Sequence, residues 1–134
     1  MNNKLPGIPD LHDGQLIGVL SSGRSAAVQA TALDGCTWTL LLKGILRLRV
    51  ADMYEGNIIF DCEVMETSSG AEAALEELVR GRQRDTDVQQ WKDKLDDGSH
   101  KLIVITPSYG ATVIALTESI EVIQGHAFLN DTTA

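Results

Sequence analysis

The chain has 134 residues, of which 43% are hydrophobic and 22% charged, and its formal net charge is −8. This length suits one domain with a self-supporting core, and the composition excludes a largely disordered chain. The acidic balance argues against general nucleic-acid binding, because the phosphates would be repelled. We expect a single domain over residues 8–126, with flexible tails at 1–7 and 127–134.

Two absences in the sequence bear on its location. No segment joins a basic start to an apolar run as secretory signals do, and no apolar run is long enough to span a bilayer. We therefore expect a cytoplasmic protein without membrane contact. Its two cysteines, Cys36 and Cys62, are then expected to be reduced and buried in strands.

Two strands are expected at the start of the chain. Leu11–Leu20 carries apolar residues at spacing two and is followed by the turn-forming run Ser21–Ser25. Ala26–Leu33 is expected to be the second strand. Asp34 and Gly35 then form a dipeptide typical of a tight hairpin.

The longest pattern in the chain runs from about Cys36 to Val50. Its even-numbered positions are apolar or glycine, which predicts a strand with one dry face and one wet face. Gly44 lies in the middle, where a missing side chain permits a bulge or a bend. The expected dry face consists of Trp38, Leu40, Leu42, Gly44, Leu46, Leu48 and Val50.

The fourth expected strand is Asn57–Glu66. Its inward face is predicted to hold Ile58, Phe60, Cys62 and Val64, with Ile59 as an exception. If it forms a hairpin with the third strand, Arg47 and Arg49 lie on the same wet face as Asp61 and Glu63. Such cross-strand charge pairs contribute about 0.2–1 kcal/mol each, which favours this pairing.

Two helices are expected next. Ser69 and Glu72 have the spacing of a capping box, and an apolar stripe at helical spacing follows through Ala71, Ala74, Leu75, Leu78 and Val79. A second short helix is expected over Thr86–Leu95, with Val88, Trp91 and Leu95 on its apolar side.

Three further strands are predicted at Lys101–Thr106, Ala111–Leu116 and Ile120–Gln124. The fold class that follows is α+β: a curved antiparallel sheet or partly open barrel of about seven strands, with two helices inserted between strands 4 and 5.

Chemical motifs are sparse. His12 and Asp13 are adjacent and could belong to a metal site or a small active site, but no further ligands stand at metal-binding spacing, and Asp13-Gly14 also suits a turn. No catalytic triad can be assigned and no dinucleotide fingerprint is present. We therefore expect no cofactor and no metal, and leave open whether His12 and Asp13 bind a ligand or partner.

Other candidate contact residues are basic or aromatic. The only dense basic cluster contains Arg80, Arg82 and Arg84, which could grip an anion or simply suit a helix C-terminus. Tyr54 and Tyr109 stand in polar turns, where exposed aromatics often mark contact surfaces, although either ring could equally fold over the core.

One stretch resembles known proteins. Leu11-His12-Asp13-Gly14-Gln15-Leu16-Ile17-Gly18, followed by the strand Leu40-Leu41-Leu42-Lys43-Gly44-Ile45, is similar to small bacterial β-rich proteins of unassigned role, some of them grouped with immunity proteins of polymorphic toxin systems. The resemblance covers about the first third of the chain and, loosely, Asn57-Ile58-Ile59. It implies a stable binding domain and assigns no catalytic residue.

The sequence favours a non-enzymatic interaction protein that binds a partner with a basic surface. A first alternative is an anion-binding domain with a pocket between sheet and helices, using Arg47, Arg49 and Arg80–Arg84. A second is a small enzyme built on His12 and Asp13. Pairing of two copies through an uncovered edge strand is also open.

Overall fold

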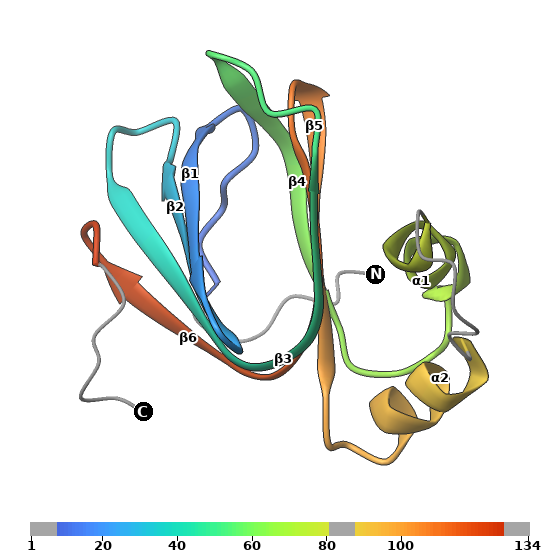
Figure 1. Cartoon of the computed structure of the whole chain (residues 1–134). Coiled ribbons are helices and arrows are strands. Elements are labelled where there is room, and N and C mark those ends of the chain that lie inside the picture. Colours follow the sequence, from blue (N-terminus) through green and yellow to red (C-terminus); the bar gives the residue numbers. More distant parts are fainter. Residues whose placement is uncertain (1–7, 81–87, 128–134) are drawn as a thin grey trace.

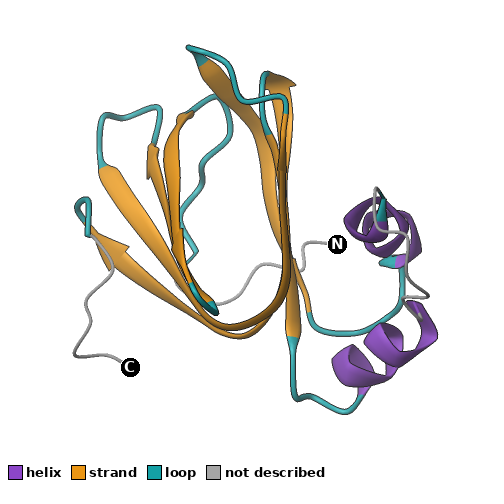
Figure 2. Ribbon diagram, viewed as in Figure 1, coloured by secondary structure: helices purple, strands orange, loops and turns teal. Residues whose placement is uncertain are grey.

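The protein is a six-stranded antiparallel barrel with two helices packed outside it (Figures 1 and 2). The computed structural model describes residues 8–80 and 88–127. The strands are β1 (Gln15–Ser22), β2 (Ser25–Thr31), β3 (Thr37–Ala51), β4 (Asn57–Met65), β5 (Lys101–Tyr109) and β6 (Thr112–Gln124). The helices are α1 (Glu72–Val79) and α2 (Val88–Asp96), and both lie between β4 and β5 in the chain.

The predicted α+β class and the place of the two helices are confirmed, but the prediction of about seven strands in a partly open barrel is wrong. The order around the barrel is β1-β2-β3-β6-β5-β4, and it closes on itself. The last two predicted strands are one continuous strand, β6. Its polar centre does not break it, because the buried Thr117 donates its hydroxyl hydrogen to the carbonyl of Lys43 at 2.7 Å.

The predicted hairpin of the third and fourth strands is also wrong. β3 pairs with β2 and β6, whereas β4 pairs with β1 and β5. Arg47 and Arg49 therefore do not face Asp61 and Glu63 across a strand pair. Side chains alternate between inward and outward on every strand of a barrel. Two strands can therefore show the same alternation without being neighbours.

The irregularity predicted near Gly44 is present in β3, but the prediction that the dry face continues unchanged through Leu46 and Val50 is wrong. Leu40 and Leu42 are fully buried, but after Gly44 the buried residue is Ile45 and Leu46 is 40% exposed. A register shift between Ile45 and Arg47 against β6 accounts for the change. Gly44 itself has φ of +72°, a conformation that glycine adopts without strain.

A similar change overturns the predicted inward face of β4. Ile59 is buried at 1% exposure, whereas Ile58 and Phe60 point outward and are 38% and 54% exposed. The pairing of β4 with β5 shifts register on both sides of Ile59. The predicted inward face is therefore correct only from Cys62 onward, where Cys62 and Val64 are buried. These two outward side chains become part of the surface described below.

The molecule has two apolar clusters. One fills the barrel and includes Leu16, Val28, Leu40 and Ile105. The other lies between the helices and the outer face of the sheet and consists of Met65, Ala71, Leu75, Leu78, Leu95, Leu102, Ile114 and Leu116, with Val88 and Trp91 packed against it. The stripes predicted for both helices are thus confirmed except for Val79, which is not part of this cluster, and burial of these stripes holds the helices on the barrel.

The predicted capping box is absent. Helix α1 begins at Glu72, and Ala71 at its N-cap makes no side-chain capping bond. The neighbouring Ser68 instead donates from its backbone N–H and its hydroxyl to the carboxylate of Asp96, both at 2.8 Å. These bonds lower the pKa of Asp96 and tie the start of α1 to the end of α2.

Substitution of Gly44 tests the bend in β3. Gly44→Ala places a methyl group 2.5 Å from the Glu118 side chain and forces a residue with a Cβ into the left-handed region. We expect unfolding by urea to show a loss of about 1–2 kcal/mol. Gly18→Ala in β1 is the control, since its added Cβ meets no atom within 4 Å; equal losses in the two variants would contradict this account of Gly44.

Candidate interaction surface

The turn before β1 is held against β4 by backbone hydrogen bonds. The Asp13 N–H donates to the Ile59 carbonyl at 2.8 Å, and the Ile59 N–H donates to the Gly14 carbonyl at 2.9 Å. Asp13 has φ of +64°, and the His12 N–H donates to the Asp10 carboxylate at 3.0 Å. Asp13 and Gly14 therefore form the tight turn that their sequence suggests, and the turn presents His12 to solvent.

The His12 ring lies on the outer side of β4. Its Nδ1 is 2.6 Å from the Phe60 carbonyl oxygen, and its ring meets the Phe60 ring edge-on, with 5.4 Å between centroids. The bond to that carbonyl, followed by the charge of Asp13, raises the pKa of His12; Asp10 and Asp61 act in the same direction. His12 thus carries a proton more readily than an isolated histidine, and three carboxylates surround it.

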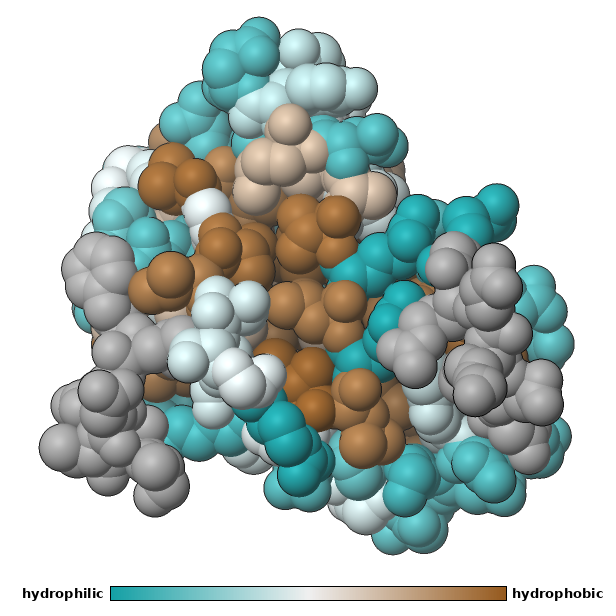
Figure 3. Space-filling view, in the orientation of Figure 1, coloured by the Kyte–Doolittle hydropathy of each residue, from teal (hydrophilic) through white to brown (hydrophobic). Residues whose placement is uncertain are grey.

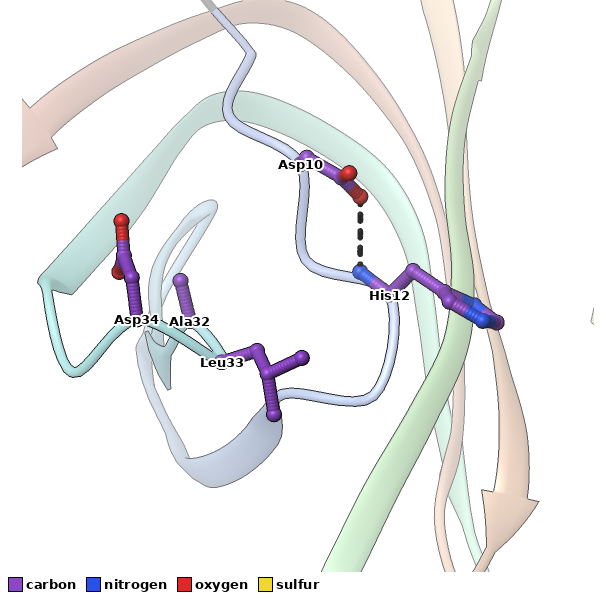
Figure 4. Close-up of a pocket in the computed structure, with 5 residues that line it drawn as sticks. All are labelled: Asp10, His12, Ala32, Leu33 and Asp34. Carbon is purple, nitrogen blue, oxygen red and sulfur yellow. Dashed lines mark hydrogen bonds between the residues drawn. The ribbon is translucent and has the colours of Figure 1, made fainter.

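A groove opens on the other side of this turn. A cavity of about 400 Å³ is lined by Asp10, His12, Ala32, Leu33 and Asp34 (Figure 4). The His12 ring points away from the groove toward β4, so its backbone forms the ridge between groove and strand. A second hollow of about 270 Å³ shares Ala32 and Leu33 and adds Asp13. We call these two hollows, with Asp10, Asp13 and Asp34 around Leu33, the acidic groove.

A row of exposed apolar side chains runs from His12 along the outside of β4. Phe60 contacts His12, and Ile58 lies two residues away on the same face. Ile58 is paired with Tyr109 of β5, and Tyr109 stacks against Tyr54 with 5.9 Å between ring centroids. We call these five residues the aromatic strip.

The buried side chain of Asn57 positions the tyrosine end of the strip. Its Oδ1 accepts hydrogen bonds from the N–H groups of Tyr54 and Ala111, at 2.9 and 3.0 Å. Its Nδ2 donates to the Tyr54 carbonyl at 2.7 Å and contacts the Met53 sulfur at 3.0 Å. One side chain thereby joins the turn before β4 to the turn after β5, which brings the two tyrosines together.

The predicted site residues fall into two groups. His12, Asp13, Tyr54 and Tyr109, scattered in the sequence, lie along one surface. Arg47, Arg49 and Arg80 lie elsewhere, where β3 meets the C-terminal end of α1. Arg82 and Arg84 fall outside the described residues.

The remaining arginines contact the helix. Arg47 Nε donates to the Leu78 carbonyl at 3.1 Å, and Arg49 Nη1 donates to the Arg80 carbonyl at 3.2 Å. Glu77 forms ion pairs with Arg49 at 3.3 Å and with Arg80 at 2.9 Å. Cations at this end interact favourably with the helix dipole, so Arg47 and Arg49 fasten α1 to β3.

Sequence reasoning missed Phe60, Ile58, Asn57, Asp10 and Asp34 as site residues. Phe60 and Ile58 were placed inward because they continue the parity of Cys62 and Val64. The available signal was Ile59, whose position among them indicates a break in the alternation. Asn57 gave no signal, because an asparagine in a polar turn is ordinary until its burial is known.

Comparison with known proteins found no matching family model, no matching curated protein and no matching solved structure. Within residues 8–80 and 88–127, no three His, Cys, Asp or Glu side chains are grouped so as to hold a metal ion. Over the same ranges, no helix has the length and apolar character needed to cross a membrane.

Removal of the Asn57 side chain tests its role as a clamp. Asn57→Ala leaves the buried N–H of Ala111 without its acceptor, so we expect a stability loss of about 2–3 kcal/mol in urea unfolding. NMR contacts between the Tyr54 and Tyr109 rings should disappear. Gln29→Ala is the control, as it removes an amide with a single hydrogen bond, to Ala127; a loss no larger than in this control would refute the clamp.

The pKa values of His12 and His100 should depart in opposite directions from the ordinary value of 6.5. The Phe60 carbonyl raises the pKa of His12, whereas burial and then Lys94 lower that of His100. The His12 contribution to stability is present below pH 6.5 and is lost as the pH rises through its folded pKa. The His100 contribution is lost as the pH falls below 6.5.

NMR titration of the imidazole Cε1–H signals measures both pKa values directly. The expected order is His12 above His100. His100→Gln should also reduce the loss of stability between pH 7 and pH 5. The reverse order of the two pKa values would contradict the contacts described for both rings.

Proposed function

We propose that this protein is a non-catalytic interaction protein that binds a protein partner with a basic surface. The contact is made through the aromatic strip and the neighbouring acidic groove. The observation that carries the proposal is that Phe60, Tyr54 and Tyr109 are exposed along β4 and the end of β5 in a chain with few aromatic residues, and that carboxylates lie at the His12 end of this strip.

The aromatic strip has the composition of a binding surface. The chain contains two residues each of Phe, Trp and Tyr, and three of these six lie in the strip. Phe60, Tyr54 and Tyr109 are 54%, 53% and 46% exposed. Burying a large ring is favourable, so exposed rings cost free energy in the isolated protein. Aromatic residues are enriched at protein–protein interfaces, where a partner would bury them.

The surrounding charges indicate the kind of partner. Asp10, Asp13 and Asp61 all act electrostatically on His12 at one end of the strip, and Asp34 lines the groove beside Asp10. A partner that presents Lys or Arg side chains here would gain attraction during approach and in the complex. The net charge of −8 acts in the same direction.

A toxin or nuclease with a cationic surface is the class of partner that fits the resemblance to immunity proteins. Such proteins act by covering the surface of an enzyme, so they need a rigid face and no catalytic group. Ile58, Phe60 and Tyr109 of the aromatic strip lie on strands of the barrel, and Asn57 fixes the tyrosine end, which supports this role.

The hydrogen bonds and burial described above favour an anion-binding domain and a small enzyme less than an interaction protein. An anionic ligand between sheet and helices would require Arg47 and Arg49, but both donate hydrogen bonds to carbonyls at the end of α1. The apolar contact of sheet and helices is filled by Leu75, Leu78 and Leu95, each 0% exposed. An enzyme would need His12 in a cleft, whereas its ring lies on the open outer side of β4.

Site-specific photo-cross-linking in the source cells tests the proposal. A benzophenone amino acid replaces Phe60 in one variant and Glu76, on the exposed side of α1, in the control. We expect the Phe60 position to cross-link one basic protein and the Glu76 position to give none. Equal cross-linking from both positions, or none from Phe60, would sink the proposal.

Charge reversal tests the acidic groove with the partner captured in this way. Asp10→Lys with Asp34→Lys should weaken binding about 10- to 100-fold, and the loss should shrink between about 0.1 M and 0.5 M salt. The matched control is Glu76→Lys with Asp93→Lys on the helices, which changes the net charge equally. If both double variants lose affinity to the same extent, only net charge matters and the groove is not the contact.

A further inference from the structure

Strand β1 is paired on one side for only a fraction of its length. With β2 it forms register pairs from Gln15 to Ser22, but with β4 it pairs only through Gln15 and Leu16. Beyond Leu16, no strand among the described residues pairs with the β4 side of Ile17–Ser22. The barrel is closed by a short contact, and the rest of β1 is an edge.

The hairpin geometry shows which backbone groups this edge presents. Gly23 and Arg24 form a two-residue turn, with Ser22 opposite Ser25 and φ of +59° at Gly23, as in a type II′ hairpin. The pair flanking such a turn exchanges hydrogen bonds, and the pattern then alternates along the strand. Val19 and Ser21 therefore direct their N–H and C=O groups away from β2, toward the open edge.

The side chains of the edge are apolar or small. Its sequence, Gln-Leu-Ile-Gly-Val-Leu-Ser-Ser, contains no charged residue and no proline. Ile17 and Leu20 are 46% and 48% exposed. Proteins ordinarily protect an exposed edge with charges, proline or a covering element, and this edge has none of these among the described residues.

Exposed apolar side chains also lie on the second half of β3. Leu46 and Val50 of β3 are 40% and 37% exposed. A hollow of about 400 Å³ lies between the end of β1, at Ser21, and the β3 segment 45–48, and Arg24 and Arg47 contribute to its lining. Figure 3 shows apolar residues gathered at the centre of this face, over the barrel, with hydrophilic residues around them.

We propose that a second copy of this chain pairs with the Ile17–Ser22 edge of β1, so that two barrels join through an antiparallel β1–β1 contact across a two-fold axis. Each copy supplies the backbone groups of Val19 and Ser21 and the apolar side chains of Ile17 and Leu20. The proposal stands independently of the proposed function.

The charge pattern selects a second copy as the occupant. A basic partner finds no carboxylate on β1, whereas it finds several at the acidic groove. Two acidic copies repel each other over most of their surface, since each carries a net charge of −8. At β1 the two-fold axis sets an uncharged strand opposite an identical uncharged strand, so no like charges are forced together.

Sedimentation velocity over about 1–500 µM protein tests the proposal. We expect the wild-type chain to shift from monomer to dimer. Leu20→Lys puts a charge on the edge, and Ser21→Pro removes one of its free N–H donors; each should weaken dimerisation at least about tenfold. Gln90→Lys on α2 adds the same charge as Leu20→Lys and should leave the dimer unchanged.

Two results would overturn the proposal: a wild-type chain that stays monomeric throughout, or edge variants that dimerise as well as Gln90→Lys. Circular dichroism and thermal melting show whether each variant is folded. Hydrogen exchange on the wild-type chain gives a readout without substitution. The amides of Val19 and Ser21 should be protected at high concentration and exposed on dilution, and concentration-independent exchange would count against pairing at this edge.

Discussion

The structure depends on the place where the barrel closes. Only Gln15 and Leu16 of β1 pair with β4, opposite Asn57 and Ile58. The side chain of Asn57 is buried there, and its polar atoms are satisfied by backbone groups of the turns on either side. A buried amide costs free energy unless it is hydrogen-bonded. Closure of the barrel therefore favours the arrangement of the two turns in which their backbone groups bond to Asn57.

This closure determines which side chains reach the surface. The turn at Asp13 is bonded to Ile59, which keeps Ile59 inside the barrel and turns Phe60 outward. The same region leaves β1 without a paired strand on its β4 side beyond Leu16. The aromatic strip on β4 and the open edge of β1 thus have a common origin, because both follow from a short contact between the first and fourth strands.

The two surfaces differ in charge, and the two proposals for them rest on that difference. Carboxylates surround the His12 end of the aromatic strip, which suits a partner of opposite charge. The edge of β1 has no charge at all, which suits a copy of itself. The described arginines of β3, by contrast, are used within the fold, where Arg47 and Arg49 satisfy carbonyl groups at the end of α1.

Local pattern was enough to predict much of this protein. Alternation in β3, the glycine at its bend, the Asp34-Gly35 hairpin and the apolar stripes of both helices depend on neighbours in the sequence, and the α+β class follows from their order. The sequence also offered His12, Asp13, Tyr54 and Tyr109 as candidate contact residues, and the structure exposes the rings of Tyr54 and Tyr109, the latter at the end of β5 and not in the predicted turn.

Only the tertiary structure decided the rest. Which strands pair depends on closure of the whole barrel, so equal parity suggested a hairpin of β3 and β4 that does not exist. A bulge shifts the inward and outward alternation of a strand by one residue. In β4 this shift buries Ile59 and exposes Ile58 and Phe60, which form part of the aromatic strip. Contacts between segments far apart in the chain also bury Asn57, place Arg47 and Arg49 against α1 and leave the edge of β1 open. A local sequence pattern cannot predict such contacts.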